Sequence, residues 1–170
     1  MSKKGVVIEE INFIIQGRKD IDAKEISSIA ISKYSQLRSA KLTECNKFSS
    51  VQEFALWWAS QFVSQDGRCC YCKTKISDIQ KLIQANLLKT RRVGRNGSGK
   101  RGPQFEVERM DSSSNEYSSE NCKLACYYCN NDKSYIFPSG DYEQFLAKSK
   151  KEYFELLLRK LKRTDWEPAI

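Results

Sequence analysis

The chain has 170 residues, of which 40% are hydrophobic and 11% aromatic, so a wholly disordered protein is excluded. Its 29 basic residues outnumber 21 acidic ones, and the formal net charge of +8 favours a polyanionic partner. The sequence has no apolar run near the ~20 residues that a membrane span needs, and MSKKGVVIEE lacks the apolar core of a signal peptide. We therefore expect a cytoplasmic protein without a membrane partner, whose seven cysteines stay reduced.

The first 45 residues carry no recognisable chemistry. A short apolar run, Val6–Ile15, is followed by a polar stretch in which apolar residues recur near helical spacing (Ile26, Ile29, Ile31 and Tyr34). This pattern predicts an N-terminal helical arm over residues 1–45, followed by one main domain over residues 46–170. The arm either packs on that domain or binds a partner, and it is the part that could supply the interface of a homodimer.

The main domain is expected to begin with a helix over residues 50–66. Ser50 and Glu53 form a capping box at its start, and Gly67 ends it. Its core-facing side is predicted from apolar residues at i, i+3 and i+4 spacing: Val51, Phe54, Ala55, Trp58 and Phe62.

A second helix is predicted over residues 77–89, with Ser77 or Asp78 as its cap. The next stretch, Thr90–Pro103, reads TRRVGRNGSGKRGP and contains five basic residues and four glycines without a repeated apolar position. It predicts a flexible basic loop, which either contacts nucleic acid or is a solvated linker. The candidate contact residues are Arg91, Arg92, Arg95, Lys100 and Arg101.

The elements after Pro103 alternate in type. We expect a short strand at Phe105–Glu108, a polar turn region at Asp111–Glu120 and a second strand at Lys123–Ala125. A helix should follow from Tyr127 to Pro138, and a long amphipathic helix at Tyr142–Lys162. The apolar side of the last helix is expected to contain Phe145, Tyr153, Leu156, Leu157 and Leu161. The fold class is therefore α+β and predominantly helical, with a small strand–loop–strand–helix unit.

Two CxxC motifs flank this unit. Zn²⁺ prefers four thiolates in a tetrahedron, and each CxxC turn presents two sulfurs, so we expect a structural zinc site at Cys69, Cys72, Cys126 and Cys129. The bland alternative is a coincidental pairing of cysteines in a reduced core. The other three cysteines are expected to be small buried side chains, at Cys45, Cys70 and Cys122.

The pattern ER-D…Y…EN…LACYYCNN-K, from Glu108 to Lys133, resembles the HNH, or His-Me finger (ββα-metal), endonuclease superfamily. It is most similar to the subgroup of restriction, phage and homing endonucleases in which two CxxC knuckles bracket the active-site hairpin. The resemblance covers about Cys69 to Tyr135. It implies a ββα-metal unit that a four-cysteine zinc site holds together, with flanking helices.

The resemblance also implies site residues. Glu108 stands where the family has an acidic ligand for Mg²⁺ or Mn²⁺, and Asn130 stands where a His or Asn completes that metal site. Asn121 matches the asparagine that braces the loop between the strands. Asn131 and Lys133 follow Asn130 and are expected to contact phosphate.

One departure concerns the chemistry, because the chain has no histidine and Arg109 occupies the family's general-base position. Arginine does not release its proton at ordinary pH, but it can bind the scissile phosphate or stabilise the transition state. Three alternatives for activating water stay open: Tyr117 as base or covalent nucleophile, as some His-lacking members are thought to use a tyrosine; Glu106 or Asp111 as base; or water on the metal itself. Of these we favour Tyr117.

The resemblance implies a metal-dependent endonuclease that hydrolyses phosphodiester bonds of double-stranded DNA, sequence-specifically, as restriction and phage enzymes do. The alternative is a catalytically inactive, HNH-derived zinc protein that only binds nucleic acid. A zinc-ribbon interaction domain without nuclease ancestry would explain the cysteines alone. Glu108 and Asn130 favour the enzyme, because structure alone does not require a carboxylate and an amide at these two positions.

Overall fold

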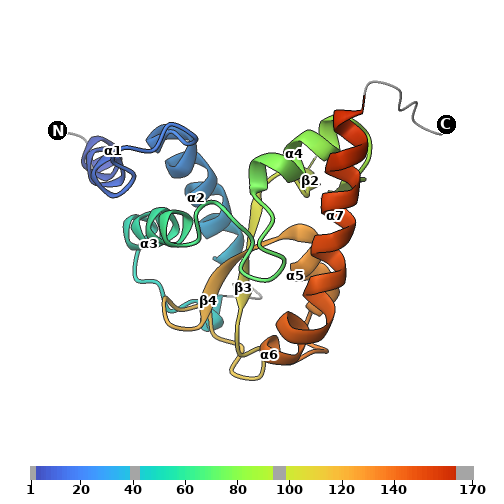
Figure 1. The fold of residues 1–170 in the computed structure, drawn as a ribbon. Coiled ribbons are helices and arrows are strands. Elements are labelled where there is room, and N and C mark those ends of the chain that lie inside the picture. Colours follow the sequence, from blue (N-terminus) through green and yellow to red (C-terminus); the bar gives the residue numbers. More distant parts are fainter. Residues whose placement is uncertain (1–2, 39–42, 94–98, 164–170) are drawn as a thin grey trace. The chain divides into compact units, whose positions relative to one another are not determined.

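The computed structural model describes residues 3–38, 43–93 and 99–163, and helices make up most of them (Figure 1). The helices are α1 (Lys3–Ile14), α2 (Ala23–Leu37), a 3₁₀ turn (Thr43–Cys45), α3 (Val51–Ser64), α4 (Ile76–Gln84), α5 (Tyr127–Lys133), α6 (Ser139–Asp141), a π-helical turn (Tyr142–Leu146) and α7 (Ala147–Lys162). The strands form two two-stranded sheets, β1 (Arg91–Val93) with β2 (Gly99–Arg101) and β3 (Phe105–Arg109) with β4 (Cys122–Cys126). The predicted class, α+β and predominantly helical, is confirmed.

The chain forms two compact units, each built from two stretches of sequence. The first contains Met1–Asp66 and Val107–Leu124, and the second contains Gly67–Glu106 and Ala125–Ile170. Strands β3 and β4 each contribute residues to both units. The predicted boundary at residue 45 lies inside the first unit, whose three long helices include both the predicted arm and α3.

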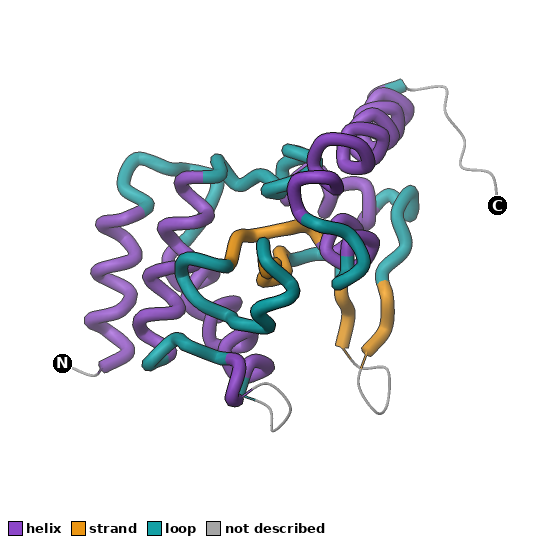
Figure 2. Tube along the Cα trace, turned by 90° about the horizontal axis from the view of Figure 1, so that it is seen from below, coloured by secondary structure: helices purple, strands orange, loops and turns teal. Residues whose placement is uncertain are grey.

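Helices α1, α2 and α3 pack on one another in the first unit, and Figure 2 shows them side by side as purple tubes. Phe54 is fully buried at the centre of an aromatic cluster, with its ring centroid 5.0 Å from that of Phe48 and 5.6 Å from that of Tyr34. Burying large apolar and aromatic side chains against each other stabilises this unit. The apolar run of the arm is therefore core sequence.

Helix α3 follows the predicted pattern closely. The Ser50 hydroxyl accepts a hydrogen bond of 3.1 Å from the Glu53 amide, while the Glu53 carboxylate accepts from the amide and hydroxyl of Ser49. The predicted capping box is thus present with its return bond shifted by one residue. The helix ends at Ser64, and Gly67 adopts φ +61°, a left-handed conformation that favours glycine.

Helix α4 begins and ends earlier than predicted. Its N-cap is Lys75, with no side-chain cap, so the prediction of Ser77 or Asp78 is wrong. The preceding turn determines where the helix starts. The Ile76 amide donates to the Gly67 carbonyl at 2.9 Å, and the backbones of Arg68 and Lys75 form an isolated antiparallel β-bridge. In the second unit, α4 packs against α7.

The predicted loop at Thr90–Pro103 contains an antiparallel hairpin, with Arg91 opposite Arg101 and Arg92 opposite Lys100. Residues 94–98, including the candidate Arg95, lie outside the described residues. The Tyr128 hydroxyl donates to the Lys89 carbonyl at 3.0 Å, which anchors the start of the hairpin. The prediction of a flexible loop is therefore wrong for β1 and β2, since long-range contacts order a sequence that has no repeated apolar position.

The last predicted helix forms a continuous helical run from Ser139 to Lys162 that includes the π-helical turn. Its buried residues are Tyr142, Ala147, Phe154 and Leu157. The predicted apolar side is right for Leu157 but wrong for Phe145, Tyr153 and Leu156, which are exposed. A π turn takes more residues per turn than an α-helix, so it changes which face later residues occupy.

No helix in the described part of the chain combines the length and the apolar character required to cross a bilayer.

Candidate metal centre and nuclease-like site

The four predicted cysteines come together in the second unit. Their ligand atoms all lie within 4.8 Å of one another, and the Sγ atoms of Cys72 and Cys126 are 3.9 Å apart. A tetrahedral Zn²⁺ with bonds of about 2.3 Å separates its sulfurs by about 3.8 Å. All four side chains are buried, at no more than 1% exposure. The residues therefore fit a closed, four-thiolate metal site with no open position.

Local backbone structure forms the two knuckles. In the first, the Lys73 amide donates to the Cys69 carbonyl at 3.1 Å and the Cys69 amide donates to the Thr74 carbonyl at 3.0 Å. Lys73 itself has φ +57°, and its ammonium contacts the Cys70 carbonyl and the Glu143 carboxylate. In the second knuckle, Cys126 ends β4 and is the N-cap of α5.

The four buried cysteines influence one another's pKa in opposite directions. Burial raises the pKa of Cys126 well above its ordinary value. Burial also acts to raise the pKa of Cys69, but hydrogen bonds from Cys126 and Cys129 outweigh it and bring this pKa well below its ordinary value. A dication held among these sulfurs would neutralise their charge.

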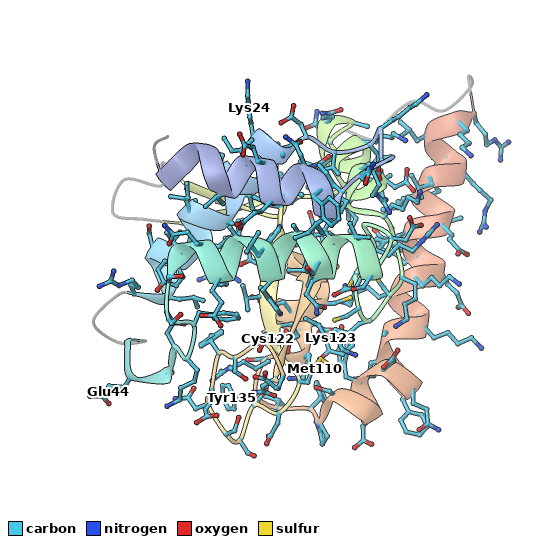
Figure 3. The ribbon with its side chains drawn as sticks, turned by 90° about the vertical axis from the view of Figure 1, so that its left-hand side faces the viewer. Lys24, Glu44, Met110, Cys122, Lys123 and Tyr135 are labelled. Carbon is cyan, nitrogen blue, oxygen red and sulfur yellow. The ribbon has the colours of Figure 1, made fainter. Side chains whose placement is uncertain are left out.

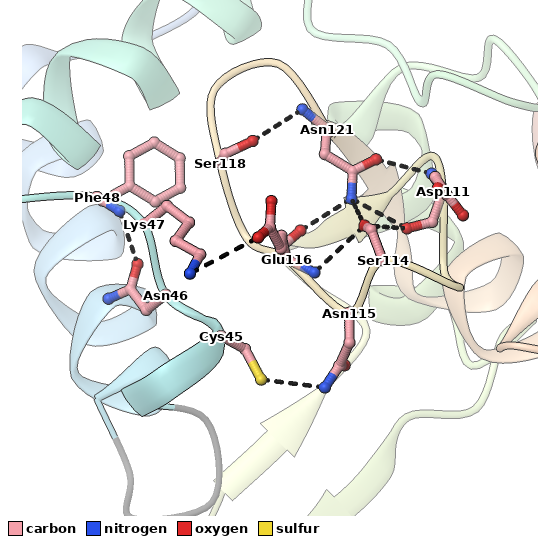
Figure 4. A network of polar contacts seen from close by, with 10 residues as sticks. All are labelled: Cys45, Asn46, Lys47, Phe48, Asp111, Ser114, Asn115, Glu116, Ser118 and Asn121. Atoms are coloured by element: carbon pink, nitrogen blue, oxygen red, sulfur yellow. Dashed lines mark hydrogen bonds and ion pairs between the residues drawn. The ribbon is translucent and has the colours of Figure 1, made fainter.

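Asn121 uses its whole side chain to hold the loop between β3 and β4 (Figure 4). Its Oδ1 accepts from the Asp111 amide at 2.8 Å, and its Nδ2 donates to the carbonyl oxygens of Asp111 and Glu116 and to the Ser114 hydroxyl, at 2.9–3.0 Å. These four hydrogen bonds join both ends of the loop. They are the kind of contacts expected of a bracing asparagine.

A segment before α3 holds the same loop, and no sequence signal pointed to it. The Tyr117 amide donates to the Cys45 carbonyl at 2.8 Å, and the Lys47 amide donates to the Tyr117 carbonyl at 2.9 Å. Figure 4 shows two further side-chain contacts. Asn115 Nδ2 donates to Cys45 Sγ at 3.0 Å, and the Lys47 ammonium forms an ion pair with the Glu116 carboxylate at 3.6 Å. Cys45 is half-buried rather than buried because it lies at this junction.

Arg109 and Tyr117 lie together in the first unit. The Arg109 guanidinium carbon is 5.0 Å from the centroid of the Tyr117 ring, and the same guanidinium donates to Asn115 Oδ1. Burial raises the pKa of the Tyr117 phenol above its ordinary value, and the positive charge of Arg109 lowers it in part. The phenol is therefore neutral at neutral pH, next to a cation that favours its ionised form.

The first unit also contains Glu108, which is only 2% exposed at the end of β3. Figure 3 labels Cys122 and Lys123 at the start of β4, where Cys122 is buried and Lys123 is exposed. Burial raises the pKa of the Cys122 thiol to about 12, so this cysteine is a protonated packing residue. The predicted residue Asn130 belongs to the second unit, and its convergence with Glu108 on one ion stays a prediction.

Arg101 lies in an unexpected place, because its guanidinium joins two predicted site residues of the second unit. Its Nε donates to Glu106 Oε1 at 3.1 Å and its Nη2 donates to Asn130 Oδ1 at 3.1 Å. Its guanidinium carbon is 5.1 Å from the centroid of the Tyr127 ring. The sequence showed a basic residue here but did not indicate its partners. Glu106, Asn130 and Tyr127 lie 5, 29 and 26 residues away along the chain.

The remaining candidates for nucleic-acid contact differ in exposure. Arg91 and Asn131 are exposed, and Arg92 and Lys100 belong to the paired strands of the hairpin. Lys133 is fully buried, and its ammonium donates to the Ser134 carbonyl at 3.3 Å. A phosphate contact by Lys133 would require its side chain to move.

No protein-family model matches the chain, and neither does any curated protein. Among solved structures the chain is similar to PacI, a rare-cutting HNH restriction endonuclease, with a TM-score of 0.52 and 23% sequence identity. The match covers 73% of this chain and 78% of that chain. At this identity the similarity concerns the fold. Over 73% of its length, this chain therefore shares its fold with that solved structure.

Proposed function

We propose that the protein is a cytoplasmic, metal-dependent endonuclease that cuts double-stranded DNA at specific sequences, as a restriction or phage enzyme does. One observation carries this proposal: a chain with the fold of an HNH restriction endonuclease has Glu108, Asn121 and Asn130 on the successive strand, loop end and helix that the resemblance requires. The bracing contacts of Asn121 and the four-cysteine cluster support it.

The basic hairpin supports DNA as the partner. The register of the hairpin pairs basic positions, Arg91 with Arg101 and Arg92 with Lys100. Basic side chains that neutralise phosphates release bound counterions, which would favour a DNA backbone along this hairpin. An arginine that reaches a base edge can also recognise guanine through two hydrogen bonds.

Two kinds of metal ion belong to the proposal. Zn²⁺ fits the four buried cysteines, where it would stabilise the fold. Mg²⁺ or Mn²⁺ would be held by Glu108 and Asn130, which offer the oxygen ligands that these ions prefer. The Asn130 Oδ1 also accepts a hydrogen bond from Arg101, whose positive charge is paired with Glu106. When bound, this ion would polarise the scissile phosphate.

The side chains would share the remaining chemistry. Arg109 would bind the phosphate and stabilise the charge of the transition state. Tyr117 would take the proton from the attacking water, with Arg109 stabilising the phenolate. The competing carboxylates are already engaged, since Glu106 pairs with Arg101 and Asp111 accepts from the amide and hydroxyl of Ser113.

The alternative function is a zinc protein that keeps the scaffold and binds nucleic acid without cutting it. The absence of histidine and the arginine at position 109 favour this reading.

A palindromic target would need two active sites, and we propose a homodimer for the active enzyme. Sedimentation with and without a DNA duplex tests that part separately.

A cleavage assay tests the function. The zinc-loaded protein is incubated with supercoiled plasmid and genomic DNA in Mg²⁺, Mn²⁺ or EDTA. Glu108→Ala and Asn130→Ala are compared with Glu120→Ala, a control that removes an exposed carboxylate from the same loop. We expect the wild type and Glu120→Ala to produce discrete fragments that depend on Mg²⁺ or Mn²⁺. Glu108→Ala and Asn130→Ala should produce none. Intact DNA in every lane, with salt-sensitive binding retained, would leave the binding protein as the function.

A further inference from the structure

We propose that Arg101 is a positioning residue of the nuclease site: it holds the side chain of Asn130 in the orientation in which its amide oxygen serves the catalytic metal. This inference rests on the proposed function, and it changes the role of Arg101 from a DNA contact to a support for a metal ligand. It also connects the basic hairpin to helix α5 through one side chain.

Three contacts define the position of the guanidinium. Hydrogen bonds of 3.1 Å run to Glu106 Oε1 and to Asn130 Oδ1, and the group lies over the Tyr127 ring at 5.1 Å. Glu106 is 7% exposed and Tyr127 is 8% exposed, so both partners are held by their surroundings. A planar fork of donors that binds two acceptors and stacks on a ring has little freedom to turn.

The backbone next to Arg101 is equally constrained. Gly102 has φ +137°, and a Cβ placed on it would lie 3.2 Å from Thr90 Cγ2 and 3.5 Å from the Tyr128 hydroxyl. This close packing fixes the direction in which the chain leaves β2. Arg101 is half-buried beside this turn, whereas Arg91, its partner across the hairpin, is exposed.

The contact with Asn130 orients the amide. Because Oδ1 accepts from Arg101, the amide oxygen and the NH₂ group cannot exchange places without losing this bond. An amide oxygen has two lone pairs, so the same oxygen is able to accept from the guanidinium and to bind a metal ion. The Glu106 carboxylate offsets the charge of Arg101, which lowers its repulsion of a nearby dication. Hydrogen bonds from neighbouring groups commonly orient metal ligands in this way.

The test compares Arg101→Gln and Arg101→Lys with Arg91→Gln. All three variants change the same hairpin, and Arg91→Gln removes an exposed charge directly opposite Arg101. Arg101→Lys keeps the charge but loses the planar fork, so it should not restore the orientation of Asn130. Circular dichroism and one zinc per chain establish that each variant is folded.

Two readouts do not depend on cleavage. The first is the side-chain NH₂ resonances of Asn130 in a ¹H–¹⁵N spectrum, which should shift in both Arg101 variants and stay in place in Arg91→Gln. The second is Mn²⁺ affinity, followed by the electron paramagnetic resonance of free Mn²⁺. We expect it to weaken about 10- to 100-fold in Arg101→Gln, the usual effect of losing a residue that orients a metal ligand, and about twofold or less in Arg91→Gln. DNA affinity should fall less in Arg101→Gln than in Arg91→Gln, because the charge of Arg101 is paired with Glu106 and Arg91 is exposed.

Four results would overturn the inference. Unchanged Asn130 resonances in Arg101→Gln would show that the contact does not orient the amide. If the wild-type protein cuts DNA but Arg101→Gln and Arg91→Gln bind Mn²⁺ with equal affinity, the inference would be wrong and the proposed nuclease function would stand. Tighter Mn²⁺ binding in Arg101→Gln would show that arginine and metal compete. A wild-type protein that neither binds Mn²⁺ nor cuts DNA would overturn the proposed function together with the inference.

Discussion

At the scale of single residues, the environment of Tyr117 limits how the site can work without histidine. The ring lies beside the Arg109 guanidinium, and the backbone of Tyr117 is bound on both sides to the segment at Cys45–Lys47. Burial keeps the pKa of the phenol above its ordinary value despite Arg109. A tyrosine in this state is almost entirely protonated at neutral pH, and the fraction of phenolate that can accept a proton increases as the pH rises.

The cleavage rate should therefore increase with pH. If phenolate is the active form, its fraction grows about tenfold per pH unit below the pKa, and the rate should follow between about pH 7 and 10. Single-turnover cleavage in Mg²⁺ measures this profile for the wild type and for Tyr117→Phe. The variant should be slower and should lose the slope. An equally steep profile in Tyr117→Phe would exclude the phenol and favour water on the metal.

Asn121 should contribute to stability as well as to the site. In Asn121→Asp, the two carbonyl oxygens that now accept from Nδ2 would face a carboxylate oxygen. We expect a loss of about 1–2 kcal/mol in unfolding free energy, because two carbonyl oxygens lose their donor and meet a negative charge. Urea unfolding measures it. Asn115→Asp is the matched control: its Oδ1 acceptor for Arg109 is retained, so the loss should stay below about 1 kcal/mol.

At the scale of elements, the caps and turns decide where helices and strands begin. Helix α3 starts at a side-chain cap, from Ser50 to the Glu53 amide, while α4 starts without a side-chain cap after the metal knuckle. The first start was readable because a capping box is local in sequence. The second was not, because contacts from Gly67 and Arg68 determine it.

Removal of the α3 cap should have a measurable cost. Ser50→Ala deletes the oxygen that accepts from the Glu53 amide, and we expect it to lower the unfolding free energy by about 1 kcal/mol. Ser50→Asp should retain most of the stability, since aspartate is an equally good cap. Thermal unfolding of the two variants makes the comparison. Equal losses in both would mean that Ser50 matters through packing instead.

The turn after β2 should tolerate glycine alone. Gly102→Ala would place a residue with a side chain at φ +137° and bring its Cβ to 3.2 Å from Thr90 Cγ2. We expect a loss of about 1–3 kcal/mol from backbone strain, measured by thermal unfolding. Gly140→Ala is the control, since its Cβ would have nothing within 4 Å. It should be neutral or stabilising by up to about 1 kcal/mol, because alanine favours helix.

At the scale of the whole molecule, the chain has two units with different sources of stability. The first contains the helices α1 to α3 and their aromatic cluster, whereas the second contains the four cysteines with α4, α5 and α7. A metal ion held by the four cysteines would add to the stability of the second unit. The first has an apolar core of its own.

Metal removal should affect the two units unequally. In Cys126→Ser, or after zinc chelation of the wild type, amide hydrogen exchange should speed up in α4, α5 and α7 and stay slow in α1, α2 and α3. Cys70→Ser is the control, since Cys70 is a neighbouring buried cysteine outside the four-cysteine group, and it should still bind one zinc. Uniform exchange throughout the chain after metal loss would show that the units unfold together.

Several features were predictable because neighbouring residues decide them. The core-facing stripe of α3 follows from apolar spacing, the strands around Phe105 and Leu124 follow from short apolar runs, and the gathering of four cysteines follows from the preferred coordination of zinc. The residues Glu108, Asn121 and Asn130 could be named because a motif records their order along the chain.

Other features depend on groups that are far apart in sequence. The hairpin of β1 and β2 has no apolar pattern, and backbone pairing, a tyrosine from α5 and an inward arginine order it. The buried face of α7 changes across a π turn that side-chain periodicity does not reveal. Sequence by itself thus determined the four-cysteine group, the main elements and the identity of the candidate site residues, since these follow from short motifs and local patterns. Only the tertiary structure decided that Arg101 contacts Asn130 and that Arg109 lies beside Tyr117, because such contacts exist only once separate segments have packed together.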